Sequence, residues 1–386
     1  MKKVTLFINS LTLGGAERVL SILATELVKQ NIEVNLLCIE KDHAYVLPKE
    51  VKITYLSNLT KHDSSLKKLL YLPYLALKLK KYTKEHQITR IQSHIYRANF
   101  TNILAKIFGS KHEVQVVEVT SINNLKDGSF SKKINFMLIQ LLYTKADLIV
   151  FKAERMKEEF LKSIPLIKNY TVINNPYDIE KIQLASNQIV EDFNFKEEKQ
   201  YIVTVGRFTF EKRHITLIKA LESLDSNIEL ILIGEGSEEA NLKEYTYANK
   251  LGERVHFLGR KENPFKYMKH SDLFVLTSKG EGFPNVIVEA MICSTPVIST
   301  DCISGPREIL APNTDINFQL KSDIELAENG LLYPVDNQES LIKAITTLLD
   351  DKERQTLYKN NGLEKSNEYT LEKIINKYKK ILCVES

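Results

Sequence analysis

The sequence has no tryptophan and only four cysteines in 386 residues, and its 14 glycines and 10 prolines form no low-complexity segment. The cysteines are Cys38, Cys293, Cys302 and Cys383, and no two of them have the Cys-x-x-Cys spacing of a metal or redox motif. We therefore expect reduced thiols, as in a cytoplasmic protein, rather than a disulfide framework.

Long apolar runs are absent as well. The apolar stretch from Val4 to Ile8 follows two lysines, as in a signal peptide, but it is short and ends at Asn9, so it predicts a buried strand. No run reaches the roughly 18 apolar residues that a transmembrane helix needs, and we expect no such helix.

Charge is unevenly distributed along the chain. The net charge is +4, yet residues 1–190 hold 28 Lys and Arg against 17 Asp and Glu, while residues 191–386 hold 25 against 32. A basic N-terminal half suits an anionic surface or an anionic acceptor. It contains no nucleic-acid-binding module, so we expect no nucleic acid partner.

Short β-branched segments alternate with helical patterns, which is typical of a parallel sheet with helices on both faces. The alternation stops at a turn-forming cluster, 174–178, and a polar stretch, and it restarts at Tyr201. The expected strands are 4–9, 33–39, 51–56, 90–93, 113–119, 147–151 and 171–173 before this break, and 201–205, 229–233, 255–258, 273–276 and 296–299 after it.

Two consecutive α/β units of similar size predict two Rossmann-like domains, with ligands bound outside the carboxyl ends of the strands, in a cleft between the domains. We place the first domain at residues 1–175 and the second at 176–368. Residues 369–386 form a C-terminal helix that we expect to pack back on the first domain.

Glycine-containing turns follow the first strand of each half. Gly14 and Gly15 open the first long helix, where backbone N–H groups can meet a negatively charged ligand, although a plain tight turn explains the pair equally well. Gly206 and Arg207 follow the first strand of the second half, with Lys212 five residues beyond Arg207. Two cations there can hold a diphosphate and stabilise it as a leaving group, although most such cations are simply solvated.

The segment 279–290 carries a sharper signal. Glu281 lies on a glycine-containing loop after a buried strand, and Glu289 lies about one turn into an otherwise apolar helix. A buried carboxylate needs a partner, such as the hydroxyls of a ribose or a cation of the protein. Glu281 is either a sugar contact or an exposed loop acid. A further turn, 302–309, either faces phosphate or simply starts a helix.

Together these segments resemble the retaining GT-B glycosyltransferases of glycosyltransferase family 4, over nearly the whole chain. The matching sequences are Gly-Gly-Ala-Glu at 14–17, Asn-Asn-Pro at 174–176, Gly-Arg-Phe-x-x-x-Lys at 206–212 and Glu-Gly-Phe-Pro-Asn-x-x-x-Glu-Ala at 281–290. The resemblance implies an α/β, GT-B fold with two facing Rossmann-like domains. It also implies transfer of a hexose or N-acetylhexosamine from a nucleotide diphosphate sugar, with UDP the most frequent nucleotide, and retention of configuration.

The resemblance gives a role to each matching residue. Arg207 and Lys212 would bind the donor diphosphate, Glu289 would bind the ribose hydroxyls, and Glu281 would hold the sugar. The other implied donor contacts are Gly14, Gly15, Gly206, Arg260, Gly282, Phe283, Pro284 and Asn285. We expect no cofactor and no metal ion, because the two cations would do the work of a divalent ion and the chain has no Asp-x-Asp triplet.

The chain departs from the family pattern after the strand 113–119, where many members have a histidine and this chain continues Thr-Ser-Ile-Asn. His94, after the preceding strand, is a candidate sugar or acceptor contact, or a structural histidine. Retention is compatible with a carboxylate nucleophile, for which Glu281 is the obvious candidate, or with front-face attack. Because Glu281 is implied to hold the sugar from the wrong side to attack, we favour front-face attack.

The basic half mixes lysines, leucines and tyrosines in helical patterns at 65–82 and 132–142. Such helices suit an anionic membrane surface, and equally a core helix with a solvated lysine face. We hypothesise a polyprenyl-diphosphate-linked saccharide acceptor, as in capsule or lipopolysaccharide assembly, and a cytoplasmic enzyme peripheral to the inner face of the membrane. The alternatives are a nucleotide-sugar epimerase, which products from donor alone would reveal, and a non-catalytic nucleotide-sugar-binding protein.

Overall fold

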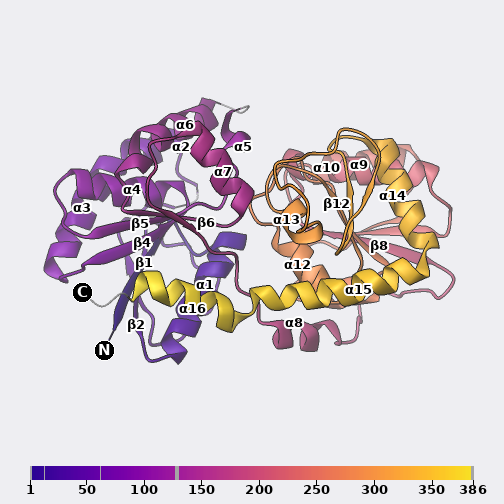
Figure 1. The fold of residues 1–386 in the computed structure, drawn as a ribbon, viewed down its shortest axis with the longest axis horizontal. Coiled ribbons are helices and arrows are strands. Elements are labelled where there is room, and N and C mark those ends of the chain that lie inside the picture. The colour runs from indigo at the N-terminus through magenta and orange to yellow at the C-terminus, as the bar shows by residue number, and fades with distance from the viewer. Residues whose placement is uncertain (1, 13, 61, 127–129, 384–386) are drawn as a thin grey trace. The chain divides into compact units, whose positions relative to one another are not determined.

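The computed structural model describes residues 2–12, 14–60, 62–126 and 130–383, and the chain forms two compact units (Figure 1). Unit 1 comprises Met1–Pro176 together with Leu371–Ser386, and unit 2 comprises Tyr177–Thr370. The first crossing between the units therefore falls at the end of the Asn-Asn-Pro turn, shortly after the last strand of unit 1, Tyr170–Val172.

Unit 1 is built on a seven-stranded sheet with the order β3-β2-β1-β4-β5-β6-β7, and every neighbouring pair in it is parallel. Its strands are mostly buried apolar runs because helices cover both faces of a parallel sheet. The strands are β1 (Lys3–Ile8), β2 (Glu33–Cys38), β3 (Lys52–Tyr55), β4 (Arg90–His94), β5 (Glu113–Val117), β6 (Leu148–Phe151) and β7 (Tyr170–Val172).

The helices of unit 1 connect these strands, and the last one comes from the C-terminus. They are α1 (Gly15–Lys29), α2 (Ser65–Leu70), α3 (Leu72–Glu85), α4 (Tyr96–Ile107), α5 (Asn123–Lys126), α6 (Phe130–Leu142), η1 (Tyr143–Lys145), α7 (Glu154–Ser163) and α16 (Leu371–Leu382). α16 buries Ile374, Ile375 and Tyr378 and packs against α1. The helical pattern at 65–82 is divided into α2 and α3, because Pro73 has no N–H for the helical ladder.

Unit 2 contains a second seven-stranded sheet with the order β10-β9-β8-β11-β12-β14-β13. All its pairs are parallel except β13 with β14, and these two short strands were missing from the sequence prediction. The strands are β8 (Gln200–Val205), β9 (Ile228–Ile233), β10 (Val255–Phe257), β11 (Leu273–Leu276), β12 (Val297–Thr300), β13 (Glu325–Leu326) and β14 (Leu331–Tyr333).

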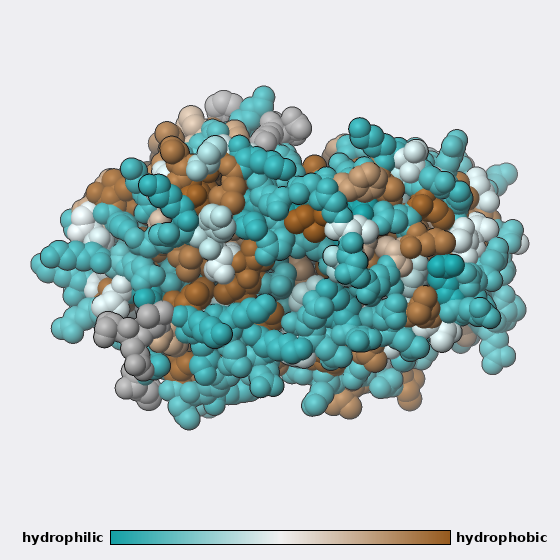
Figure 2. Space-filling view, in the orientation of Figure 1, coloured by the Kyte–Doolittle hydropathy of each residue, from teal (hydrophilic) through white to brown (hydrophobic). Residues whose placement is uncertain are grey.

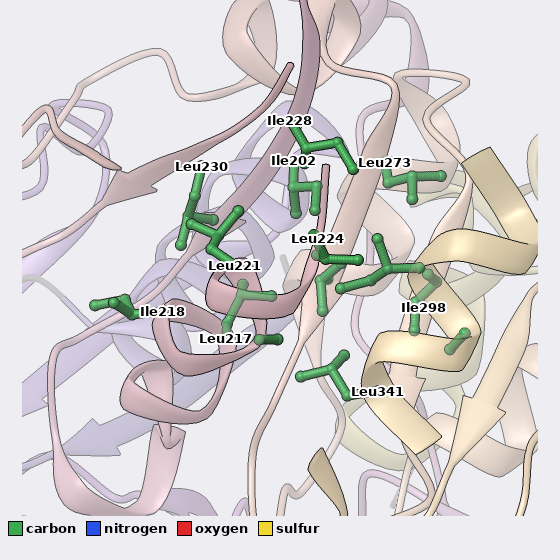
Figure 3. Close-up of a cluster of buried hydrophobic side chains, with 14 of the residues drawn as sticks. Ile202, Leu217, Ile218, Leu221, Leu224, Ile228, Leu230, Leu273, Ile298 and Leu341 are labelled. Carbon is green, nitrogen blue, oxygen red and sulfur yellow. The ribbon is translucent and has the colours of Figure 1, made fainter. Parts of the chain in front are cut away.

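The helices of unit 2 are α8 (Ile179–Ser186), η2 (Phe210–Lys212), α9 (His214–Ala220), η3 (Leu221–Ser223), α10 (Glu239–Ala248), α11 (Phe265–His270), α12 (Asn285–Ile292), α13 (Pro306–Leu310), α14 (Gln338–Asp350), α15 (Lys352–Ser366) and η4 (Asn367–Tyr369). The helices α9 and α14 bury apolar side chains in the core of the sheet, whereas α15 packs against α12 and α14. Leu217, Ile218 and Leu221 lie on one face of a helix and gather with Ile202 of β8 and Leu230 of β9 in the core (Figure 3).

The strand order reverses once in each sheet, and this switch point indicates where along the sheet edge a ligand would bind. β1 lies between β2 and β4, and β8 lies between β9 and β11, so consecutive crossovers leave in opposite directions there. In open α/β sheets the crevice outside the carboxyl ends of the strands at such a switch point is where ligands bind. Among the described residues, no helix combines the length and apolar character that crossing a bilayer requires.

Candidate active site

The turn after β8 fixes the backbone of Arg207 while it leaves the side chain in solvent. Phe208 is fully buried; its N–H donates to the carbonyl of Glu235 (2.9 Å), and its own carbonyl accepts from the N–H of Glu238 (2.9 Å). The turn is therefore held from both sides of Phe208, and Arg207 is exposed at the carboxyl edge of the sheet. A cation in this position can meet an anion without moving the backbone.

Two glycines after β9 allow this turn to approach and were not picked out from the sequence. A Cβ on Gly234, whose φ is +150°, would lie 1.9 Å from the carbonyl oxygen of Gly206, and a Cβ on Gly236 would lie 2.3 Å from the carbonyl oxygen of Phe208. Both contacts are with backbone, so neither can be relieved by a side-chain rotation. The Gly-Glu-Gly sequence directly after a buried strand was the signal that could have identified them.

Lys212 and Glu281 meet although 69 positions separate them in the chain. The hydroxyl of Thr277, just after β11, donates to the carbonyl of Lys212 (2.7 Å), and the N–H of Lys279 donates to the carbonyl of Glu211 (2.9 Å). These bonds join the η2 turn to the loop after β11, and Lys212 Nζ then lies 2.5 Å from Glu281 Oε1. The pair is only partly enclosed, with 26% of the lysine side chain and 11% of the glutamate side chain exposed.

The loop 282–285 is supported from the loop after β12. Ser304 Oγ donates to the carbonyl of Gly282 (2.9 Å), and a Cβ on Gly305, whose φ is +87°, would collide with Pro284 Cδ at 2.3 Å. Phe283 is buried edge-on against Tyr369, with ring centroids 5.3 Å apart. The loop backbone is thus held rigidly beside Glu281, with its oxygen and nitrogen atoms at the carboxyl edge.

α12 begins directly after this loop and carries the second glutamate. Asn285 Oδ1 accepts a hydrogen bond from the hydroxyl of Tyr177 (2.7 Å), and Glu289, one turn further on, is 2% exposed. Arg260 is exposed after β10, and the carbonyl of the preceding Gly259 accepts from the N–H of Gly234 (2.9 Å). The loops after β8, β9 and β10 are therefore hydrogen-bonded to one another in series.

The turn 302–309 does not offer its arginine to a ligand. Arg307 is 2% exposed; its Nε lies 3.0 Å from Asp301 Oδ1, and its Nη2 lies 2.7 Å from Asp301 Oδ2 and 2.8 Å from Glu325 Oε2. Asp301 and Glu325 raise the pKa of Arg307 through hydrogen bonds, against the effect of its burial. This cluster is a structural centre of unit 2, which the sequence analysis did not identify.

At the switch point of unit 1, Gly14 caps α1 and Gly15 is the first residue of that helix. His94 ends β4 and is 1% exposed; its Nε2 lies 3.2 Å from Gln92 Oε1, and its Nδ1 has no hydrogen-bond partner in the described part of the chain. Burial, together with Lys152, holds the pKa of His94 well below its usual value. The histidine is therefore a neutral, enclosed group in this structure.

Two further titratable groups end the neighbouring strands. Glu118 follows β5, and burial raises its pKa to about 7 although the N–H groups of Val119 and Thr120 donate to it. Lys152 follows β6 against Tyr378, and burial lowers its pKa to about 7. In the described ranges no three His, Cys, Asp or Glu side chains are grouped as metal ligands would be.

Sequence comparison identifies two families along the chain. Residues 13–181 match the profile described as glycosyltransferase family 4, and residues 186–365 match that of glycosyl transferases group 1. An N-acetylgalactosamine-N,N'-diacetylbacillosaminyl-diphospho-undecaprenol 4-alpha-N-acetylgalactosaminyltransferase from Campylobacter jejuni is 32% identical over 97% of both chains. A second C. jejuni enzyme, an alpha-1,4-N-acetyl-D-galactosaminyltransferase named for a diNAcBac-PP-undecaprenol acceptor, is 27% identical over 99% of both chains.

Solved structures share the fold of the whole chain. A sucrose-phosphate synthase from Thermosynechococcus elongatus has a TM-score of 0.79 at 18% identity, covering 99% of this chain and 98% of its own. HepE from Anabaena, solved in complex with UDP, has a TM-score of 0.74 at 20% identity and 99% coverage of both chains. The prediction of a GT-B fold with two Rossmann-like units is confirmed.

Proposed function

We propose that this chain, which belongs to glycosyltransferase family 4 and is a glycosyltransferase, transfers a hexose or N-acetylhexosamine from a UDP-sugar to a lipid-linked saccharide. The relatives named for undecaprenyl-diphosphate-linked acceptors, and the neighbour solved with UDP, support the two substrates. The single observation that carries the proposal is the pairing of Lys212 with Glu281 at the switch point of unit 2, beside exposed Arg207.

The donor diphosphate lies at the end of β8 in this proposal. Arg207 and Lys212 hold its oxygens through charge-assisted hydrogen bonds, which strengthen as charge develops on the leaving group. Glu281 and the backbone of 282–285 hold the sugar, and Glu289 holds the ribose hydroxyls from inside α12. Arg260 lies beside the nucleobase, and Gly206 lets the turn approach the diphosphate.

Transfer proceeds with retention and without a metal ion. The acceptor hydroxyl oxygen attacks the anomeric carbon on the face that the diphosphate leaves, and the departing diphosphate oxygen takes the hydroxyl proton. Glu281 is a poor nucleophile for the double-displacement route, because the ammonium group of Lys212 lies 2.5 Å from its Oε1. Gly14 and Gly15 keep the donor-contact role that the resemblance implies, and His94 of unit 1 contacts the acceptor or the transferred sugar.

A membrane-facing surface on unit 1 supports a lipid-linked acceptor and a peripheral location on the inner face of the cytoplasmic membrane. Leu66, Leu70, Tyr74 and Leu77 are more than half exposed along α2 and α3, and hydrophobic residues gather over this part of unit 1 (Figure 2). Exposed lysines accompany them, which is the combination that binds anionic lipid surfaces. Lys80 does not belong to this surface, because its ammonium group caps α4 at the carbonyl of Phe108 (2.6 Å).

Nucleotide binding tests the donor site. Thermal unfolding is measured in EDTA with UDP, GDP or ADP for the wild type and for Arg207→Ala and Glu289→Ala, with Arg354→Ala on α15 as an arginine control. UDP at about 100 times its dissociation constant should add about 2.7 kcal/mol of stability to the wild type and the control only. A stabilisation that survives in both donor-site variants, or that requires added metal, would refute the assignment.

Vesicle flotation tests the membrane surface. The protein should float with anionic phosphatidylglycerol vesicles and not with neutral phosphatidylcholine vesicles, and Leu70→Glu/Leu77→Glu should remain in solution. Leu184→Glu/Leu357→Glu is the matched control, because these leucines are equally exposed but lie in unit 2. Equal flotation of the two double variants would show that α2 and α3 do not bind the membrane.

A further inference from the structure

A cavity of about 530 Å³ lies in unit 1, and none of the proposed donor contacts lines it. It begins at Asn9 and Ile95, which follow β1 and β4 at the switch point of the sheet. Its outer wall comes from α2, the start of α3 and the first turns of α6. The cavity therefore connects the ligand-binding edge of the sheet with the surface helices.

Most of the lining is apolar. The apolar side chains are Leu66, Leu69, Leu72, Phe100 and Ile134. Ile95 lines the cavity in a backbone conformation, φ 71° and ψ 146°, that a β-branched residue rarely adopts. Such strained positions cluster where a fold clamps a ligand. Polar side chains also line the cavity, at Asn9, Ser65, Tyr96, Ser131 and Asn135. A branched hydrocarbon would bury surface against the leucines, Phe100 and Ile134.

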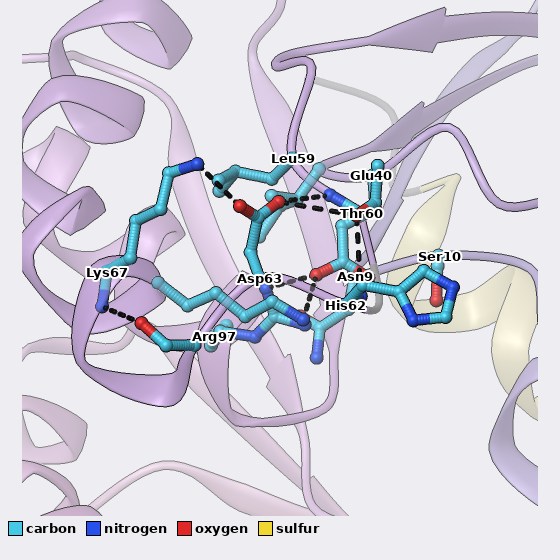
Figure 4. Close-up of polar contacts among 12 residues, drawn as sticks. Asn9, Ser10, Glu40, Leu59, Thr60, His62, Asp63, Lys67 and Arg97 are labelled. Carbon is cyan, nitrogen blue, oxygen red and sulfur yellow. Dashed lines mark hydrogen bonds and ion pairs between the residues drawn. The ribbon is translucent and has the colours of Figure 1, made fainter.

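One side of the cavity is cationic. Arg97 Nη1 lies 2.7 Å from Glu40 Oε1, and Lys68 Nζ lies 3.1 Å from the same atom of this buried carboxylate (Figure 4). Lys68 and Arg97 thus place two cations against the same carboxylate. The neighbouring Asp63 and Lys67 form a pair that is balanced in itself. The amino end of α4, on which Arg97 lies, adds to the positive potential.

We propose that this cavity binds the prenyl diphosphate end of the acceptor, which rests on the proposed function. The first isoprene units lie among the leucines of α2 and Ile134 of α6, and the diphosphate lies at Arg97 and Lys68. The rest of the chain leaves over Leu66, which lines the cavity and is 65% exposed. The cavity thus discriminates lipid-linked acceptors from free saccharides.

The absence of tryptophan makes the test direct, because one introduced indole is the only one in the protein. Leu66→Trp places it at the cavity mouth, and Leu70→Trp places it one turn along α2, equally exposed but outside the cavity. Without vesicles, geranylgeranyl diphosphate below its micelle concentration should shift the emission of Leu66→Trp saturably and leave Leu70→Trp unchanged. Inorganic diphosphate and geranylgeraniol should each reach half of the maximal emission shift only at a concentration at least about tenfold higher than geranylgeranyl diphosphate, because each lacks one half of the ligand.

Two cavity variants in the Leu66→Trp background complete the experiment. Arg97→Gln should weaken geranylgeranyl diphosphate about tenfold through one lost charge-assisted bond, and Ile134→Glu should abolish binding. Stabilisation by UDP, which reports on unit 2, should persist in both. The proposal is overturned if inorganic diphosphate binds as well as the prenyl compound, if Leu70→Trp responds equally, or if folded Leu66→Trp does not respond.

The transfer reaction separates this proposal from the proposed function. Wild-type protein with a UDP-sugar should give product from a lipid-free saccharide acceptor at high concentration. Ile134→Glu should raise the KM for a polyprenyl-diphosphate-linked saccharide toward the value for the lipid-free saccharide, because the variant loses the contacts with the prenyl chain. If both acceptors gave product with the same KM, in the wild type and in Ile134→Glu alike, the cavity assignment alone would be overturned. Prenyl diphosphate binding without any transfer would overturn the proposed function alone.

Discussion

Arg307→Ala should destabilise unit 2 strongly and Arg207→Ala hardly at all, while the losses of transfer activity should fall in the opposite order. Arg307 forms two parallel bonds with Asp301, whose side chain is 0% exposed, and two more with Glu325. Removing the guanidinium leaves Asp301 buried without its cation. Arg207 is exposed beyond the end of β8 and supports no packing.

The magnitudes follow from these environments. Breaking a buried pair from one side costs about 3–5 kcal/mol, which at a urea m-value of about 2–3 kcal/mol/M lowers the unfolding midpoint by about 1–2.5 M. An exposed substitution changes stability by no more than about 0.5 kcal/mol. Losing a donor that stabilises the leaving group should lower kcat/KM for Arg207→Ala by about 10²–10³-fold.

Urea unfolding followed by circular dichroism, beside initial rates of transfer, measures both quantities on the same preparations. The double variant Arg307→Ala/Asp301→Ala should be less destabilised than the sum of its parts, because it leaves no buried charge unpaired. If Arg307→Ala unfolded at the wild-type midpoint but no longer bound UDP, the turn 302–309 would be a phosphate site after all and the buried-pair reasoning would be wrong.

Two further perturbations test the packing. Gly234→Ala should lower the free energy of unfolding by at least about 2–3 kcal/mol, as at other strained backbone sites, and should weaken UDP binding by displacing Gly206. Gly252→Ala, which has open space around the glycine, should change neither the stability nor the stabilisation by UDP in the same thermal melts. Glu118→Gln should become more stable relative to the wild type as the pH rises. Burial raises the pKa of Glu118 to about 7, so ionisation of this carboxyl destabilises the folded wild type. This destabilisation is nearly absent below the unfolded pKa of about 4 and complete above pH 7. Melting at pH 5 and pH 8 should show a relative gain of about 2 kcal/mol at the higher pH, and a constant difference would mean that Glu118 is ionised without penalty.

The architecture could be predicted because parallel strands buried on both faces read as apolar runs, and each run here was bounded by turn residues. The twelve strands that the alternation indicated are present, with ends that differ by one or two residues. β13 and β14 were missed because they follow the last predicted strand and the antiparallel β13 falls outside the alternation of parallel strands and helices on which the prediction rested. The break between α2 and α3 was overlooked although Pro73 stood in the sequence, because the leucine pattern continues across it.

The loops of the candidate site could be predicted, but their partners could not. The loops that carry Gly206 and Gly282 follow parallel strands, so both lie at the carboxyl edge of the sheet in any order of the strands. That Lys212 meets Glu281 depends on β11 pairing with β8 on the side away from β9, which no local pattern encodes. The buried cluster of Arg307 likewise could not be predicted, because it depends on the position of Asp301, which follows β12.

The ion pair between Lys212 and Glu281 affects how tightly UDP binds, and a substitution that removes the charge of Glu281 but keeps its size tests this effect. In the protein without donor, the carboxylate holds the ammonium group at 2.5 Å, so an incoming diphosphate must compete with Glu281 for Lys212. Glu281→Gln removes the competing charge while it keeps the size of the side chain. UDP alone should then bind several-fold more tightly, while turnover of the UDP-sugar falls because the sugar loses its carboxylate partner.

Isothermal titration with UDP, beside kcat for transfer, measures the two effects, and Lys212→Met is the matched variant that should weaken both. Weaker UDP binding by Glu281→Gln would mean that the carboxylate positions Lys212 for the diphosphate instead of competing for it. The opposite signs expected for binding and turnover cannot arise from a general loss of structure, because a disordered loop would weaken both together.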